Sequence, residues 1–217
     1  MISKTFIFLI LLFTTVFTSC DRLKKNSQSQ STDEKEKFMN LTASDSTGQL
    51  MNEDDFWELI DKSRTAANND YQIQISSLKA ILLTHEAHEI EKFDNTFTTL
   101  LASSYDTKLW GASYVINGGC SDDCFDYFRQ YLIGHGKEKF YQTLKDPESC
   151  VSWIKTEEED NWEGLQYAAM NAYKQKTGKD LPRTYHPKFE LKGKPFDEET
   201  IFRQYPKLAK KYMSDDN

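Results

Sequence analysis

The chain has 217 residues and a formal net charge of −7, and 38% of its residues are hydrophobic. That length and apolar content suffice for one compact domain with a single core. An acidic balance without a cluster of lysine and arginine argues against nucleic acid as a partner, because neutralisation of phosphates dominates such binding. It argues equally against a polybasic contact with a membrane surface.

The first 19 residues have the pattern of a cleaved secretory signal. Lys4 supplies a positive charge, a largely apolar stretch covers residues 6–17, and the small residues Thr18 and Ser19 follow. The apolar stretch is shorter than the roughly 20 residues that span a bilayer. With Cys20 directly after it, the segment resembles a bacterial lipoprotein signal. The resemblance implies that the Cys20 thiol is diacylated with palmitate-type chains and becomes the new N-terminus; the alternative is an uncleaved signal anchor with an incidental cysteine.

The lipoprotein resemblance also implies a location. The protein is expected in the bacterial cell envelope, attached to the inner or outer membrane by its N-terminal lipid and facing an extracytoplasmic compartment. Removal of residues 1–19 takes away Lys4 and no acid, which makes the mature chain −8 overall. Residues 20–50 hold the lipidated cysteine and a polar stretch with little to bury, so we expect a flexible tether there.

Residues 51–213 are predicted to form a single compact all-α domain. Apolar residues recur at helical spacing in this range, and no alternating strand pattern of useful length occurs. Asn52 is the predicted N-cap of a first helix with an apolar face from Phe56 to Ile60. Gly178 is expected to end the 162–176 helix. The remaining expected helical segments are 71–84, 86–102, 107–116, 121–133, 137–144, 147–154 and 197–213.

The segment from His85 to Glu89 nearly spells the zinc motif His-Glu-x-x-His. Its second histidine stands three residues after the first instead of four, and glutamate occupies position 89. Because no further ligands converge on it, we interpret the segment as a solvated polar face of a helix. The sequence predicts no metal and no cofactor.

Three cysteines remain if Cys20 is acylated, in a compartment that permits disulfides. An odd number allows at most one internal bridge. We predict that Cys120, Cys124 and Cys150 are mainly packing residues, with a bridge between Cys120 and Cys150 left open.

A dense group of polar residues surrounds the expected turn before residue 121. Gly118 and Gly119 let the backbone turn sharply, Ser121 can cap the next helix, and Asp122 and Asp123 lie in its first turn. This is the one place where glycine, acid and arginine lie so close together in the sequence.

One stripe of that helix carries Asp122, Asp126 and Arg129, given about 100° of rotation per residue. One interpretation is a capped helix start with a surface ion pair. The other is a carboxylate pair steered by Arg129 beside free backbone N–H groups, which suits a zwitterionic or hydroxyl-rich ligand. The predicted ligand site, with the tryptophans as walls, consists of Trp110, Asn117, Gly118, Gly119, Ser121, Asp122, Asp123, Asp126, Arg129, Trp162 and Glu163.

The same residues carry a family resemblance. The runs from Trp110 to Ala112, Gly118 to Asp123 and Phe125 to Arg129 look like the signature of the bacterial family catalogued as domain of unknown function 4240. The resemblance covers about residues 51–213, and the signal and tether look like an addition to it. It implies no activity, because the family has no established reaction. Cys124 stands where a glycine or another small residue is expected, so a metal or redox site at Cys120 and Cys124 is not implied.

Two functions follow as hypotheses. The preferred one is a membrane-anchored module that binds a small polar ligand or a protein partner, since no nucleophile–base pair is evident. The alternative is a hydrolase-type enzyme that uses the carboxylates of Asp122 and Asp126. The absence of a Ser-His-Asp order, a phosphate loop and a dinucleotide fingerprint favours binding.

Overall fold

The computed structural model describes residues 49–68, 70–154 and 163–213. Within those ranges the chain is all-α, as predicted, and its β-type pairing is an isolated parallel bridge between Asp106 and Lys192. No helix in these ranges is long and apolar enough to cross a membrane. The predicted signal, Cys20 and nearly all of the tether lie outside the described residues. The elements are α2 (Glu53–Ala67), α3 (Tyr71–Leu82), α4 (Ala87–Ser103), α5 (Thr107–Asn117), α6 (Asp122–Gly134), α7 (Lys137–Lys145), η1 (Pro147–Ser152), α8 (Leu165–Thr177), η3 (Ile201–Arg203) and α9 (Pro206–Tyr212).

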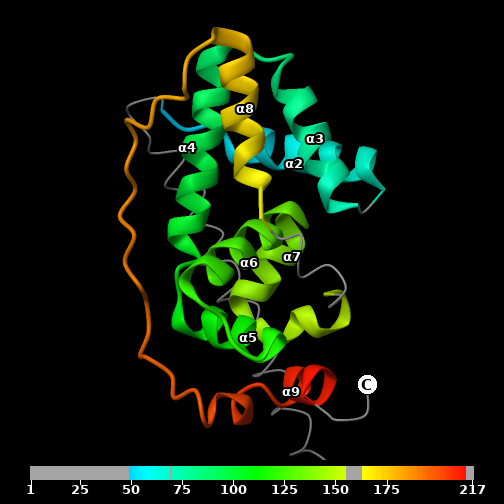
Figure 1. Cartoon of the computed structure of the whole chain (residues 1–217), viewed down its shortest axis with the longest axis vertical. Coiled ribbons are helices and arrows are strands. Elements are labelled where there is room, and N and C mark those ends of the chain that lie inside the picture. Colours follow the sequence, from blue (N-terminus) through cyan, green and yellow to red (C-terminus); the bar gives the residue numbers. More distant parts are fainter. Residues whose placement is uncertain (1–48, 69, 155–162, 214–217) are drawn as a thin grey trace, which may run out of the picture.

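Two groups of helices lie one above the other along the long axis of the molecule (Figure 1). One group consists of α2, α3, α4 and α8, and the other contains α5, α6 and α7, with α9 beyond α5. Helix α6 contacts α2, α4 and α8, so it joins the two groups. Its Phe125, Phe128, Tyr131 and Leu132 are fully buried and lie in the shared hydrophobic core.

Local capping signals set most of the helix ends. The Asn52 side chain accepts a hydrogen bond from the backbone N–H of Asp54 at 2.9 Å, as predicted. Ser121 caps α6 in the same way. Gly118 and Gly178 end α5 and α8 in the left-handed conformation, with φ of 64° and 72°.

Two predicted helix boundaries are wrong, because the 197–213 segment divides into η3 and α9 and the 162–176 helix begins later than expected. The helical segment predicted at 147–154 forms as a 3-10 helix, η1. Pro147 and Pro206 each begin an element, since proline cannot continue a preceding helix but suits a first turn. Helix α8 begins at Leu165 because Gly164, with φ of 116°, interrupts the helical backbone.

Residues 180–197, which we call the strap, leave α8 and run without helix along α4 toward α5 (Figure 1). Three prolines within it prevent a helix. Lys192 fastens the strap, because its N–H donates to Tyr105 at 3.0 Å and its carbonyl accepts from Thr107 at 2.9 Å. The strap thereby covers one side of α4 and forms a wall of the pocket described below.

Candidate functional site

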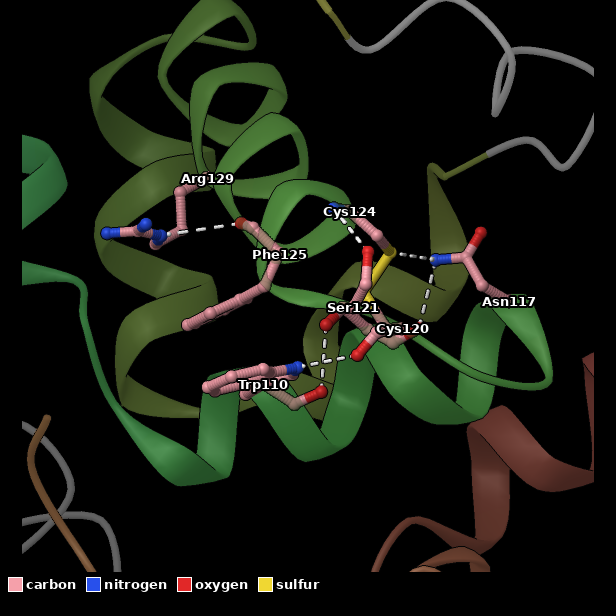
Figure 2. Close-up of a disulfide and its surroundings, with 8 residues drawn as sticks. Trp110, Asn117, Cys120, Ser121, Cys124, Phe125 and Arg129 are labelled. Carbon is pink, nitrogen blue, oxygen red and sulfur yellow. Dashed lines mark hydrogen bonds between the residues drawn. A yellow bond between two sulfur atoms is a disulfide. The ribbon is translucent and has the colours of Figure 1, made fainter.

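The predicted turn between α5 and α6 is closed by a disulfide bond between Cys120 and Cys124 (Figure 2). The Cα atoms of the pair are 5.3 Å apart, within the usual range for a disulfide. The Ser121 hydroxyl accepts the N–H of Cys124 at 3.3 Å. Asn117 approaches from α5, with its Nδ2 3.6 Å from the Cys124 sulfur. These contacts hold the turn against the first turn of α6.

The disulfide corrects the prediction that all three cysteines are packing residues. The capped turn brings residues 120 and 124 together, so the bridge left open between Cys120 and Cys150 is not the one that forms. Cys150 does pack in the core, where it is fully buried and its thiol donates to the Pro147 carbonyl at 3.0 Å. Burial raises the pKa of the Cys150 thiol to about 12, so it stays protonated.

Trp110 fixes the turn from the α5 side. Its indole Nε1 donates to the Cys120 carbonyl at 2.9 Å, and its ring stacks on Phe125 with 5.0 Å between centroids (Figure 2). Gly118 and Gly119 have φ of 64° and 145°, and nothing lies within 4 Å of the place a Cβ would take. These glycines are therefore required by the backbone conformation, not by close approach of another group.

Arg129 forms the predicted ion pair, with Nη2 2.9 Å from Asp126 Oδ1, but the arginine end of the pair is buried and only the Asp126 end is partly exposed. Arg129 is 4% exposed, and its Nη1 donates to the Leu101 carbonyl of α4 at 2.6 Å. The guanidinium also lies over the rings of Tyr105 and Phe125, at 4.9 and 4.8 Å. Arg129 thus ties α6 to α4, and it projects from the side of α6 opposite the disulfide (Figure 2).

The remaining predicted residues do not gather around the turn. Asp122 and Asp123 are exposed in the first turn of α6. Glu163 is also exposed and accepts a hydrogen bond from the Tyr167 hydroxyl at 3.0 Å. Burial and the charges of Glu163 and Asp123 raise the pKa of Tyr127, which places Glu163 beside α6. Trp162 lies outside the described residues, and the other ten predicted residues do not line one pocket together.

The residues from His85 to Glu89 span the N-terminal end of α4, in which Glu86 is the N-cap and Ala87 the first helical residue. The Glu86 N–H donates to Glu89 Oε2 at 2.9 Å in a capping box, and His85 Nδ1 is 3.5 Å from the same carboxylate. Across the described part of the chain, no group of three or more His, Cys, Asp or Glu side chains converges as metal ligands.

A pocket of about 340 Å³ lies between α4, α6, the start of α8 and the strap. Its volume falls at the lower end of the range for small-molecule sites. Of the predicted site residues, Asp126 lines it. The lining residues are Asp94, Asn95, Thr98, Leu101, Asp126, Gln166, Arg183, Tyr185, His186, Pro187 and Phe189.

Asp94 is the most unusual residue of this pocket. It is 4% exposed, and its Oδ1 is buried without a hydrogen-bond partner among the described residues. Burial raises the pKa of Asp94 to about 6, against an opposing effect of the Arg183 charge. Buried carboxylates are normally paired or hydrogen-bonded, so an unpartnered one beside a pocket marks a candidate binding residue.

The sequence contained a signal for Asp94 that motif reasoning missed. Asp94 stands four residues after Ile90 and three before Phe97, so it occupies the apolar stripe of α4. An acid in a core position is the kind of local inconsistency that accompanies function. The pocket itself could not be predicted, because the strap that completes it is about 90 residues away in sequence.

A second hollow, an open groove of about 670 Å³ along α2, has its charges satisfied. Glu58 pairs with Lys62 at 2.6 Å, Asp61 with Arg64 at 2.9 Å, and Lys137 with Asp54 at 2.8 Å. Because these charges are already paired with one another, the groove is a weaker candidate for a polar ligand than the pocket at Asp94.

A family model described as "Protein of unknown function (DUF4240)" matches residues 51–175, more than half of the chain. The chain belongs to this family. Comparison with curated proteins and with solved structures gives no significant match.

The DUF4240 match covers some walls of the pocket and leaves out another. It contains α4, α6 and the start of α8, and therefore Asp94, Asp126 and Gln166. The strap residues Arg183 and His186 lie beyond residue 175. The pocket thus combines walls from the matched DUF4240 region with a wall from the segment that follows it.

Proposed function

We propose that the chain is a lipid-anchored protein of the bacterial cell envelope whose helical domain binds a small polar ligand in the pocket at Asp94. The observation that carries the proposal is the buried Asp94, which lines the pocket and has one carboxylate oxygen without a hydrogen-bond partner among the described residues. Such a carboxylate costs folding free energy, and a ligand that supplies the missing partner recovers it on binding. Costs of this kind gather at functional sites.

The signal-like residues 1–19, Cys20 and the disulfide support the location together. Disulfides persist in oxidising, extracytoplasmic compartments and are rare in the cytosol. The Cys120–Cys124 bond is therefore the type of crosslink expected of an exported domain. Two or more acyl chains on Cys20 would suffice for stable attachment.

The geometry favours binding over hydrolysis. Both carboxylate oxygens of Asp126 are engaged, one by Arg129 at 2.9 Å and the other by Gln130 at 2.8 Å. Asp122 lies exposed at the start of the helix. A general acid or base must present an oxygen to the substrate, whereas both Asp126 oxygens already accept hydrogen bonds within α6. A concave pocket also suits a small ligand better than the flat surface of a protein partner.

The anchor is tested with Cys20→Ala. We expect this variant to leave the membrane fraction or to accumulate as an uncleaved precursor, because no thiol is available for acylation. Mass spectrometry of the wild-type protein should find a mature, acylated N-terminus at Cys20. A mature start at any other residue would contradict the proposed anchor.

Binding is tested by thermal unfolding of the full-length chain with amino acids, amines, carboxylates, sugars and nucleotides at millimolar concentration. A ligand that binds only the folded state raises the melting temperature by mass action. We expect at least one class to do so in the wild type and in Asp55→Asn, an exposed control with the same charge change, but not in Asp94→Asn. A panel that leaves the wild-type melting temperature unchanged contradicts the proposed function.

A further inference from the structure

The pocket brings an acidic side chain, Asp94, and a basic side chain, Arg183, near each other without a hydrogen bond between them. The charge of Arg183 acts on Asp94, yet Asp94 Oδ1 has no hydrogen-bond partner. The acceptor found for Arg183 in the described part of the chain is the Met170 sulfur, 3.3 Å from Nη2. A thioether is a weak acceptor and a guanidinium has five N–H donors, so Arg183 retains donors for another group.

Several other polar groups of the pocket have hydrogen-bond partners in the fold. Arg129 and Gln130 donate to the two carboxylate oxygens of Asp126. Asn95 donates to the Gln49 carbonyl at 3.0 Å. The Tyr185 hydroxyl accepts from Thr99 at 3.3 Å. Asp94 on α4, buried, and Arg183 on the strap, exposed, are two side chains of opposite charge with which a bound molecule could pair.

We infer that the pocket binds a small zwitterion, whose ammonium group pairs with Asp94 and whose carboxylate or similar acidic group pairs with Arg183. The inference rests on the proposed function, because it assigns a ligand class to the same pocket. A ligand with one charge would pair with only one of Asp94 and the exposed Arg183, whereas a zwitterion pairs with both and adds no net charge. Arginine suits the acidic end because its planar fork can bind a carboxylate through two N–H groups.

The test is calorimetric titration of the full-length chain at pH 7. The zwitterionic probes are glycine, L-serine and L-glutamine; the one-charge probes are ethanolamine and acetate; the neutral probe is glycerol. We expect at least one zwitterion to bind at least about tenfold more tightly than every one-charge or neutral probe, because the one-charge probes lack one of the two charge-assisted pairs and glycerol lacks both.

Two substitutions probe the two ends of the ligand. Asp94→Asn and Arg183→Gln should each weaken zwitterion binding by at least about tenfold. Asp55→Asn and Arg203→Gln carry the same charge changes on exposed residues outside the pocket, and they should leave the affinity unchanged. Melting temperatures of all four variants establish that each one is folded.

The outcomes separate the ligand class from the proposed function. If acetate, ethanolamine or glycerol binds as tightly as the zwitterions and Asp94→Asn abolishes that binding, the zwitterion assignment is wrong while the pocket remains a binding site. If zwitterions bind but neither Asp94→Asn nor Arg183→Gln weakens them, the assignment is also wrong. If no probe binds in the titration, the zwitterion assignment is wrong. If the wider panel also leaves the melting temperature unchanged, the proposed function is wrong as well.

Discussion

Arg129 and Asp94 are both charged and both 4% exposed, but their surroundings differ. Arg129 has an ion pair, a backbone acceptor and two aromatic rings around it. Asp94 has an oxygen without a hydrogen-bond partner and a pocket beside it. The first arrangement stabilises the contact between two helices, and the second costs stability that a ligand can recover.

The structural role of Arg129 gives the first prediction. Arg129→Met should lower the free energy of unfolding by about 3 kcal/mol, because the Leu101 carbonyl and Asp126 Oδ1 lose the N–H groups that the guanidinium donates to them. Asp126→Asn should cost about 1 kcal/mol, since the amide oxygen still accepts from Arg129. Urea unfolding measures both values. An Arg129→Met variant as stable as the wild type would show that the guanidinium does not hold α6 to α4.

Asp94 gives a prediction about pH. Its pKa of about 6 in the folded state exceeds the value of about 3.9 in an unfolded chain, so folding favours the protonated acid. The contribution of Asp94 to stability is therefore fully present below about pH 4 and is lost as the pH rises to about 6. The loss amounts to about 2–3 kcal/mol.

Asp94→Asn removes this dependence, since an amide does not ionise. At pH 7 the variant should be more stable than the wild type in the absence of ligand, and the difference should shrink toward pH 4. The urea midpoints of the wild type and the variant are measured between pH 4 and pH 7 and subtracted at each pH. The pH effects of the other carboxylates are the same in both proteins and cancel in the difference. A variant less stable than the wild type at pH 7 would mean that the Asp94 carboxylate has a partner in the fold.

At the scale of the elements, α6 is held at its start by the disulfide and near its middle by Arg129. The Cys120–Cys124 bond closes a loop of only four residues in sequence separation, so its reduction should cost no more than about 2 kcal/mol. In Cys20→Ala, unfolding without reductant should expose one reactive thiol, Cys150, and unfolding after reduction should expose three. Ellman titration counts them. Three thiols without reductant would rule out the bond.

Helix ends were predictable because their causes are local. Asn52, Ser121 and Gly178 act within one turn of the helix that they begin or end, so sequence spacing suffices to find them. The disulfide was not predictable in this way, since three thiols allow several pairings. The burial of Arg129 depends on Leu101, 28 residues away, and no local pattern reports it.

At the scale of the whole molecule, the pocket depends on how the strap lies against α4. The strap is fastened at Lys192, whose backbone pairs with Tyr105 and Thr107, and Gly193 follows with φ of 87° against the Thr107 side chain. Between this fastening and α8, the strap brings Arg183 to the pocket that contains Asp94. The pocket therefore requires both the helical core and the segment beyond the DUF4240 match.

The most direct test of the account is the pKa of the Asp94 side chain, measured by carbon NMR of its carboxyl group in the full-length chain. Arg183, His186, Asp126 and Tyr185 face the same pocket, so the titration is compared with that of Arg183→Gln. The account predicts a pKa near 6 in the free protein and a lower value with the tightest-binding zwitterion of the panel, because an ammonium group favours the ionised carboxylate. An ordinary pKa near 4 in the free protein, or no change when that zwitterion is bound, would contradict it.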